Sequence, residues 1–207
     1  MVTLAINTAS STKSVALLAG RELLCETTWS ERAKESEKLL PSIEKLLKRC
    51  GPTGGKTFRN VERIIVVSGH GSFSAVRVGV TIANTLAHIL GVPLYSIDTE
   101  TMWSLRIPFA DAVSISHAGR DNVLYSGKIT RVSDLPKHKN FYGDITDEEK
   151  KSLKGAWIPE GKVPSFGRGL ADMMARKSLG ALKKEKIVKP FYLFPPLLVS
   201  FPQICSI

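Results

Sequence analysis

Residues 69–74, with the sequence Gly-His-Gly-Ser-Phe-Ser, are placed to bind an anion. They follow the apolar run 64–67 and precede an apolar helical pattern, so that free backbone N–H groups would lie at a helix N-terminus. Ser74 replaces the third glycine of the dinucleotide-binding motif, however, and no acidic residue follows at the usual distance. A tight strand-to-helix turn fits this pattern as well as a weak phosphate or nucleotide site does. The residues of that site would be Gly69, Gly71, Ser72 and Asn7.

A second glycine-rich segment, residues 51–57, lacks the first glycine of an NTPase phosphate-binding loop, because Cys50 stands in its place. It also follows a helical pattern instead of a strand, so we interpret it as a connector. The four histidines lack metal-ligand spacing, and the three widely spaced cysteines exclude CxxC-type zinc sites. No GxSxG motif or nucleophile beside a base is present. The sequence therefore predicts no catalytic residue, metal site or cofactor.

The helix expected over residues 74–90 has an unusual charge distribution, because residues 78–97 contain no charged side chain. A helix on the surface of a monomer normally carries Lys and Glu on its outer face. This outer face is therefore expected to be covered, either by a protein partner or by a second layer of the same domain. Small residues recur at a spacing of four, which would admit a close neighbouring helix. They are Ala75, Gly79, Ala83 and Ala87.

The pattern of residues 1–100 predicts the elements that position these segments. Three short apolar runs with tight turns, over 3–7, 14–18 and 22–29, indicate an antiparallel meander. A helix follows over 39–50, with Leu39, Ile43, Leu46 and Leu47 on its apolar face. Buried strands are expected over 61–68 and 94–97, with the apolar helix between them. This βββ-α-β-α-β order predicts a mixed α/β sheet with crossover helices.

The second half is less regular. Strands are expected over 112–116 and 122–132, and helices over 147–153 and 169–184, while prolines exclude a continuous helix through 191–207. The formal net charge of the 207 residues is +10, of which residues 101–207 contribute +7, so a polyanion partner is one possibility there. The N-terminus has no secretory signal and no run of 18 residues is mostly apolar and free of helix breakers. We therefore expect a cytoplasmic chain without a membrane span.

Six segments together resemble the TsaB family of bacteria. They are residues 4–9 (LAINTA, for LAIDTS), 35–43 (ESEKLLPSI, for HSExLLPxI), 69–79 (GHGSFSAVRVG, for GPGSFTGLRIG), 91–94 (GVPL, for GIPL), 118–125 (AGRDNVLY, for DARRGEVY) and 189–193 (KPFYL, for PxYLR). The segment over 69–79 is the most specific of these. The resemblance spans most of residues 1–193, with gaps in the middle of the second half.

The resemblance implies an α/β, actin/sugar-kinase/Hsp70-like (RNase H-like) fold with mixed sheets in two lobes. The lobes would be residues 1–100 and 101–193, leaving 194–207 as a tail of unknown role. It also implies a non-catalytic subunit of the complex that forms threonylcarbamoyl-adenosine beside the tRNA anticodon. Its partners would be a TsaD-like transferase, a TsaE-like ATPase and tRNA through the complex, with a second copy of the chain as an alternative occupant of the same helices. The partner-binding helix faces would contain Leu39, Leu40, Ile43 and Leu47, and Ala75, Gly79, Ala83 and Ala87.

Departures from related proteins bear on the chemistry. The transferases of this class bind a metal through two histidines, whose places are taken here by Thr99 and Trp103, neither of which replaces imidazole as a ligand. Asn7 replaces the opening carboxylate of the fold, which argues against autonomous ATP chemistry. Glu35 stands where TsaB has His. A stand-alone ATP-dependent small-molecule kinase or ATPase is the alternative function, and a metallopeptidase is a third possibility.

Overall fold

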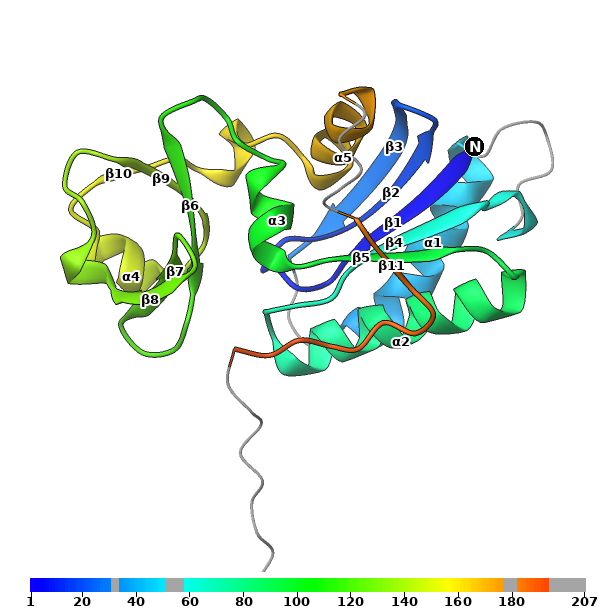
Figure 1. Ribbon diagram of the computed structural model, residues 1–207, viewed down its shortest axis with the longest axis horizontal. Coiled ribbons are helices and arrows are strands. Elements are labelled where there is room, and N and C mark those ends of the chain that lie inside the picture. Colours follow the sequence, from blue (N-terminus) through cyan, green and yellow to red (C-terminus); the bar gives the residue numbers. More distant parts are fainter. Residues whose placement is uncertain (31–33, 51–57, 177–181, 194–207) are drawn as a thin grey trace, which may run out of the picture.

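The computed structural model describes residues 1–30, 34–50, 58–176 and 182–193, which form two β-sheets (Figure 1). The strands of the first sheet lie in the order β11 (Lys183–Glu185), β5 (Leu94–Ile97), β4 (Arg63–Val67), β1 (Val2–Asn7), β2 (Lys13–Ala19) and β3 (Glu22–Trp29). Strands β1, β4 and β5 are parallel, whereas β2, β3 and β11 are antiparallel to their neighbours. The predicted meander and mixed sheet are confirmed.

Helices cover both faces of this sheet. Figure 1 shows α1 (Glu35–Cys50) and α2 (Phe73–Leu90) on one face and α5 (Phe166–Ala175) on the other. Because both faces are covered, every residue of β1 and β4 is buried. Helix α2 ends where Gly91 adopts the left-handed conformation, with a φ of 65°, and its N–H bonds to the carbonyl oxygens of Ala87 and His88.

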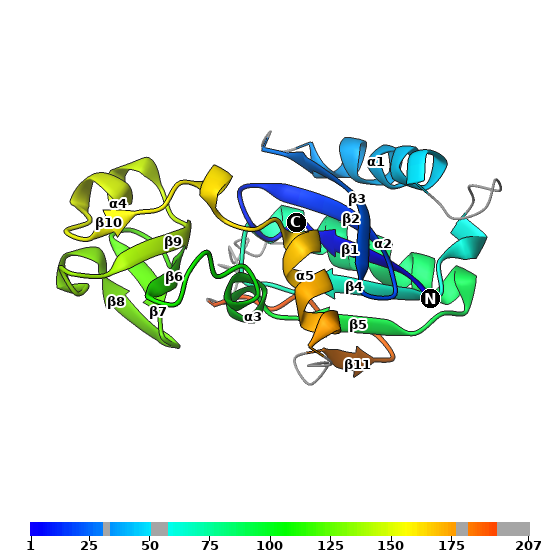
Figure 2. The same ribbon diagram turned by 90° about the horizontal axis from the view of Figure 1, so that it is seen from above.

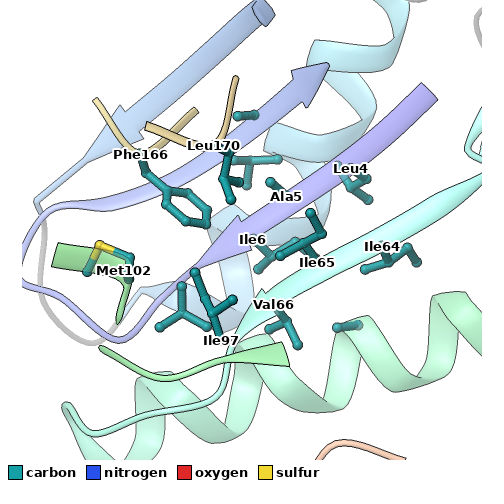
Figure 3. Packing of buried hydrophobic residues seen from close by; sticks show 14 of the residues in the cluster. Leu4, Ala5, Ile6, Ile64, Ile65, Val66, Ile97, Met102, Phe166 and Leu170 are labelled. Carbon is teal, nitrogen blue, oxygen red and sulfur yellow. The ribbon is translucent and has the colours of Figure 1, made fainter. Parts of the chain in front are cut away.

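Branched aliphatic side chains of β1 and β4 fill the space between the layers. Figure 3 shows Ile65 and Val66 beside Leu4 and Ile6, with Phe166 of α5 nearby. All of these side chains are essentially inaccessible to solvent. The first sheet is therefore a rigid platform, and the helices that it carries are positioned by burial of their inward faces.

The second sheet is smaller. Its strands lie in the order β10 (Ala156–Trp157), β9 (Asn140–Asp144), β6 (Ala112–His117), β7 (Asn122–Tyr125) and β8 (Lys128–Arg131). Helix α4 (Asp147–Ser152) begins with a capping box formed by Thr146 and Glu149, and α3 (Thr99–Ser104) lies between the two sheets. Three short 3-10 helices complete the described elements: η1 (Phe58–Asn60), η2 (Val132–Asp134) and η3 (Glu160–Lys162).

The structure corrects the boundary expected near residue 100. Helix α5 and strand β11 fall in the second part of the sequence, yet both pack on the first sheet, and Val188 belongs to the same core. The first lobe is therefore discontinuous, and the second sheet is inserted between its parts. Arg106 joins the two segments that connect the lobes, the one after α3 and the one before α5. Its Nε donates to the Pro164 carbonyl oxygen (2.7 Å) and its guanidinium pairs with Glu160. The tail, 194–207, lies outside the described residues.

Candidate protein interface

The inward faces of α1 and α2 contain most of the residues expected to contact a partner. Leu39, Ile43 and Leu47 of α1 are at most 2% exposed and belong to the core against the first sheet. In α2, the four small residues are also buried, and they face the chain itself: Ala75, Gly79, Ala83 and Ala87. Of the residues expected to bind a partner, Leu40 is therefore the one that is exposed in this chain, at 40%.

Gly79 shows why the small residues point inward. A Cβ atom added there would lie 2.1 Å from Oγ1 of Thr8, in the loop that follows β1. Thr8 is fully buried, so it cannot move aside into solvent. The stripe of small residues thus lets the helix approach its own sheet and loop.

One flank of α2 is apolar and partly exposed to solvent, although Val78, Ile82 and Leu86 also pack against the core. Val78, Ile82 and Leu86 are half-buried at spacings of four, and Ile89, on the same flank, is 70% exposed. No acidic residue and, after Arg77, no lysine or arginine interrupts the helix. A contiguous apolar flank of this kind on a surface helix is typical of a protein-binding surface. We call Val78, Ile82, Leu86 and Ile89 the α2 flank.

Helix α2 is also the one helix of the described residues that is long and apolar enough, by length and composition, to cross a membrane. Its hydrophobicity is explained by position: its inward face is buried against β4 and β1 of the first sheet.

The opposite flank of α2 is covered by the chain itself, which the sequence did not predict. Residues 186–193, here called the strap segment, run along α2 (Figure 1). Asn84 donates to the Val188 carbonyl oxygen and accepts from the Val188 N–H, both at 2.9 Å. The Phe191 N–H donates to the Ser68 carbonyl oxygen, at 2.7 Å. The only sequence signal was an asparagine in the polar arc of an otherwise apolar helix.

The structure gives the glycines of the expected phosphate loop a steric role. A Cβ atom at Gly69 would lie 2.0 Å from the Phe191 carbonyl oxygen, and one at Gly71 would lie 2.0 Å from that of Ala9. Asn7 is buried and uses its amide internally, since its Nδ2 donates to Ser10 Oγ and its Oδ1 accepts from the Ala9 N–H.

Ser72, the N-cap of α2, is exposed and its side chain makes no capping hydrogen bond. His70, between the two glycines, is buried, which lowers the pKa of its imidazole. Asn7 is thus buried and hydrogen-bonded within its own loop, whereas Ser72 is exposed.

An acidic side chain already occupies the neighbouring anion-binding position. Asp144, at the end of β9 in the second lobe, accepts a hydrogen bond of 2.6 Å from the backbone N–H of Ser11 in the turn between β1 and β2. A phosphate at this turn would have to displace a carboxylate of the same chain.

The positions that would hold a metal have other contacts. Thr99 Oγ1 donates to the His70 carbonyl oxygen at 2.6 Å, and the buried Trp103 ring packs under Arg106. Within the described residues, no group of three or more His, Cys, Asp or Glu side chains is arranged to hold a metal ion. The residues at these positions do not fit a resident metal. The expected connector, 51–57, lies outside the described residues.

Known proteins are similar to this chain in sequence and in fold. Residues 23–162 match the family model described as TsaD: tRNA N6-adenosine threonylcarbamoyltransferase. The tRNA threonylcarbamoyladenosine biosynthesis protein TsaB of Bacillus subtilis (strain 168) is 30% identical over 159 residues, which are 76% of this chain and 65% of that relative. The chain belongs to the TsaD-type family that the model describes. The match thus spans slightly less than two thirds of the length of the TsaB relative.

Solved structures agree with this assignment at the level of the fold. YeaZ from Pseudomonas aeruginosa superposes with a TM-score of 0.70 at 18% identity, over 93% of this chain and 99% of that chain. An uncharacterized protein described as similar to peptidase YEAZ from the same organism gives 0.71, also at 18% identity, over 93% and 99% of the two chains. The predicted fold class, α/β with mixed sheets in the two lobes of the actin/sugar-kinase/Hsp70-like class, is confirmed.

One departure from the TsaB motif is explained by a contact. Glu35 stands at the first position of α1, where the motif has His, and its Oε1 lies 3.2 Å from Nζ of Lys13 at the start of β2. Both side chains are buried. This ion pair fixes the N-terminus of α1 on the sheet. The substitution therefore has a partner in this chain, and it does not open the helix toward solvent.

Proposed function

We propose that this chain is a non-catalytic subunit in the formation of threonylcarbamoyl-adenosine in tRNA, and that it binds a TsaD-like transferase. The observation that carries the proposal is the partly exposed α2 flank. In that complex ATP and metal chemistry would belong to the partners, a TsaD-like transferase and a TsaE-like ATPase. The complex would act in the cytoplasm, where tRNA is found.

The α2 flank has the physical properties of an interface core. Ile89 is more than two-thirds exposed, and Leu40 of α1 adds a second exposed aliphatic side chain on the helical layer. Full burial of one such side chain contributes about 1.5–3 kcal/mol. No buried charge would have to be desolvated, because α2 contains no lysine or arginine after Arg77 and no acidic residue. A second copy of the chain would find the same surface, so a homodimer is the competing occupant.

The contacts of the turn between β1 and β2 and of the predicted phosphate loop support a non-catalytic role. Asp144 holds the Ser11 N–H, Asn7 is engaged within its own loop, and Thr99 is bonded to the His70 carbonyl group. A kinase or ATPase needs these positions free for phosphate and for its cation. The described residues therefore contain no feature that favours the stand-alone kinase or the metallopeptidase.

The test is co-purification of the chain with the TsaD-like transferase of the same organism, using the variant Ile89→Glu. Placing a carboxylate in the interface is expected to weaken the complex at least tenfold. Ile129→Glu is the matched control, because Ile129 is also an exposed isoleucine (48%) but lies on β8 of the second lobe. Cells carrying Ile89→Glu in place of the wild-type gene should lose threonylcarbamoyl-adenosine from tRNA, as mass spectrometry of tRNA nucleosides would show. Equal complex formation by both variants would exclude the α2 flank as the interface.

A further inference from the structure

The positive charge of the second half is concentrated in the part that returns to the first lobe. Residues 101–162 have a net charge of +2, whereas residues 163–193 have a net charge of +5. Within the latter, Lys183, Lys184, Lys186 and Lys189 are all exposed and fall within seven residues. The single acidic residue among them, Glu185, lies 3.8 Å from Lys183. The other three lysines have no carboxylate within 4 Å among the described residues.

The strap segment carries two of these lysines, Lys186 and Lys189, onto α2. The ring of Tyr192 lies against that of Phe73, with the centroids 4.8 Å apart. The guanidinium of Arg77 lies over the Phe73 ring, 5.1 Å from its centroid. Because Asn84 holds Val188 farther along the helix, Lys189 lies between two fixed points on the same flank as Arg77. Neither α2 nor residues 186–193 contain Asp or Glu.

Aromatic rings lie beside the cations. Phe191 is 52% exposed and Phe73 is 41% exposed, although each could have been buried in a chain of this size. A row of cations recognises a polyanion, and exposed rings beside it offer stacking surfaces for nucleic-acid bases. Acidic lipid headgroups would also bind a row of cations, but they do not account for the paired aromatic rings.

We propose that the strap segment, together with Lys184 and Arg77, forms a contact surface for the phosphate backbone and bases of an RNA. That this RNA is tRNA rests on the proposed function. The surface lies on the flank of α2 opposite to the α2 flank defined above, so a protein partner and an RNA would bind the same helix at once.

Contacts from four side chains to phosphates predict a strong dependence on salt. The logarithm of the binding constant falls with the logarithm of the salt concentration, with a slope of about −0.9 for each phosphate contact, so four contacts give a slope of about −3.6. Binding should therefore be about 150-fold weaker at 200 mM than at 50 mM salt. Each lysine that is lost should reduce the slope by about 1.

The experiment measures binding of unmodified tRNA transcript to the isolated full-length chain by fluorescence anisotropy across this salt range. The double variant Lys186→Glu/Lys189→Glu should reduce the slope by about 2 and weaken binding at 50 mM salt at least tenfold. The matched control is Lys137→Glu/Lys139→Glu, which makes the same charge change at exposed positions of the second lobe and should have a smaller effect. Thermal unfolding of both variants at the wild-type temperature would exclude misfolding as the cause.

The outcomes separate this proposal from the previous one. Loss of tRNA binding in the strap variant, with retained binding to the transferase, supports an RNA surface here. Equal losses in both lysine variants, or no salt-dependent binding by the wild-type chain, would overturn it whatever the transferase result. Strap-dependent binding to phosphatidylserine vesicles without binding to tRNA would identify a membrane surface and also overturn it. Failure of Ile89→Glu to disrupt the transferase complex would contradict only the proposed function.

Discussion

Substitution of Gly79 by alanine tests whether the small residues of α2 pack against the chain's own sheet or face solvent until a partner binds. If the glycine faced solvent in the isolated chain, alanine would stabilise the helix by about 1 kcal/mol. The structure predicts the opposite sign, because the added methyl group would lie 2.1 Å from Thr8 Oγ1 and 3.2 Å from its Cβ and Cγ2.

The magnitude follows from two opposing effects. Forcing an additional methyl group into a packed site costs about 1–3 kcal/mol, and Thr8 has no exposed surface through which to relieve the contact. The gain in helix propensity offsets about 1 kcal/mol of this. The Gly79→Ala variant should therefore lose up to about 2 kcal/mol of unfolding free energy.

The assay is urea unfolding of the wild type, Gly79→Ala, Thr8→Ala and the double variant. Removing the Thr8 hydroxyl and methyl groups should make room for the alanine, so the two substitutions should show a favourable coupling of about 1–3 kcal/mol. Thr85→Ala, on the exposed side of the same helix, is the control and should be neutral or slightly stabilising. A Gly79→Ala variant that is more stable than the wild type, by the same amount in both backgrounds, would refute the inward orientation.

Three further predictions concern polar side chains of the first lobe. Burial lowers the pKa of His70, so below about pH 6.5 the native state binds fewer protons than the unfolded state. The free energy of unfolding should therefore decrease as the pH falls below this value, by at most about 1.4 kcal/mol per pH unit. His70→Gln should lack this loss, and parallel urea midpoints for both proteins from pH 7.5 to 5.5 would contradict it. Lys13→Met leaves the Glu35 carboxylate buried without its partner and should cost about 3–5 kcal/mol in thermal or urea unfolding, whereas Lys13→Arg should restore most of it. Asn84→Leu removes both hydrogen bonds to Val188, so amide exchange and proteolysis of the strap segment should accelerate while the rest of the chain stays protected. Unchanged amide exchange at Val188 would show that these two hydrogen bonds do not hold the strap segment on α2.

The regular elements of the first hundred residues were predictable because each has a strong local pattern. The run Ile64–Val67 is apolar throughout, as a strand covered on both faces must be, and Gly91 with Pro93 ends α2 where the pattern indicated. Strand β11 was not predictable, because its Lys-Lys-Glu sequence has no apolar alternation and is recruited only by pairing with β5. Its place in the first lobe depends on contacts between residues far apart in the chain.

The candidate interface was predictable only in part. Its location on α2 followed from the missing charges, but the face did not, because small residues serve equally for packing on another helix or on a sheet. Only the position of Thr8 beside Gly79 decides between these. The lysines of residues 183–189 were visible as excess charge in the second half, yet assigning them to a surface required knowing that the strap segment lies along α2.

The insertion of the second sheet within the first has a consequence during synthesis. Strand β5 keeps an unpaired hydrogen-bonding edge until β11 has left the ribosome, about 90 residues later, which corresponds to roughly 4–18 s of translation at about 5–20 residues per second. During that interval the nascent chain exposes a parallel, apolar strand edge, the kind that recruits other strands. Slowing elongation during this interval should therefore increase the demand of this protein for chaperones.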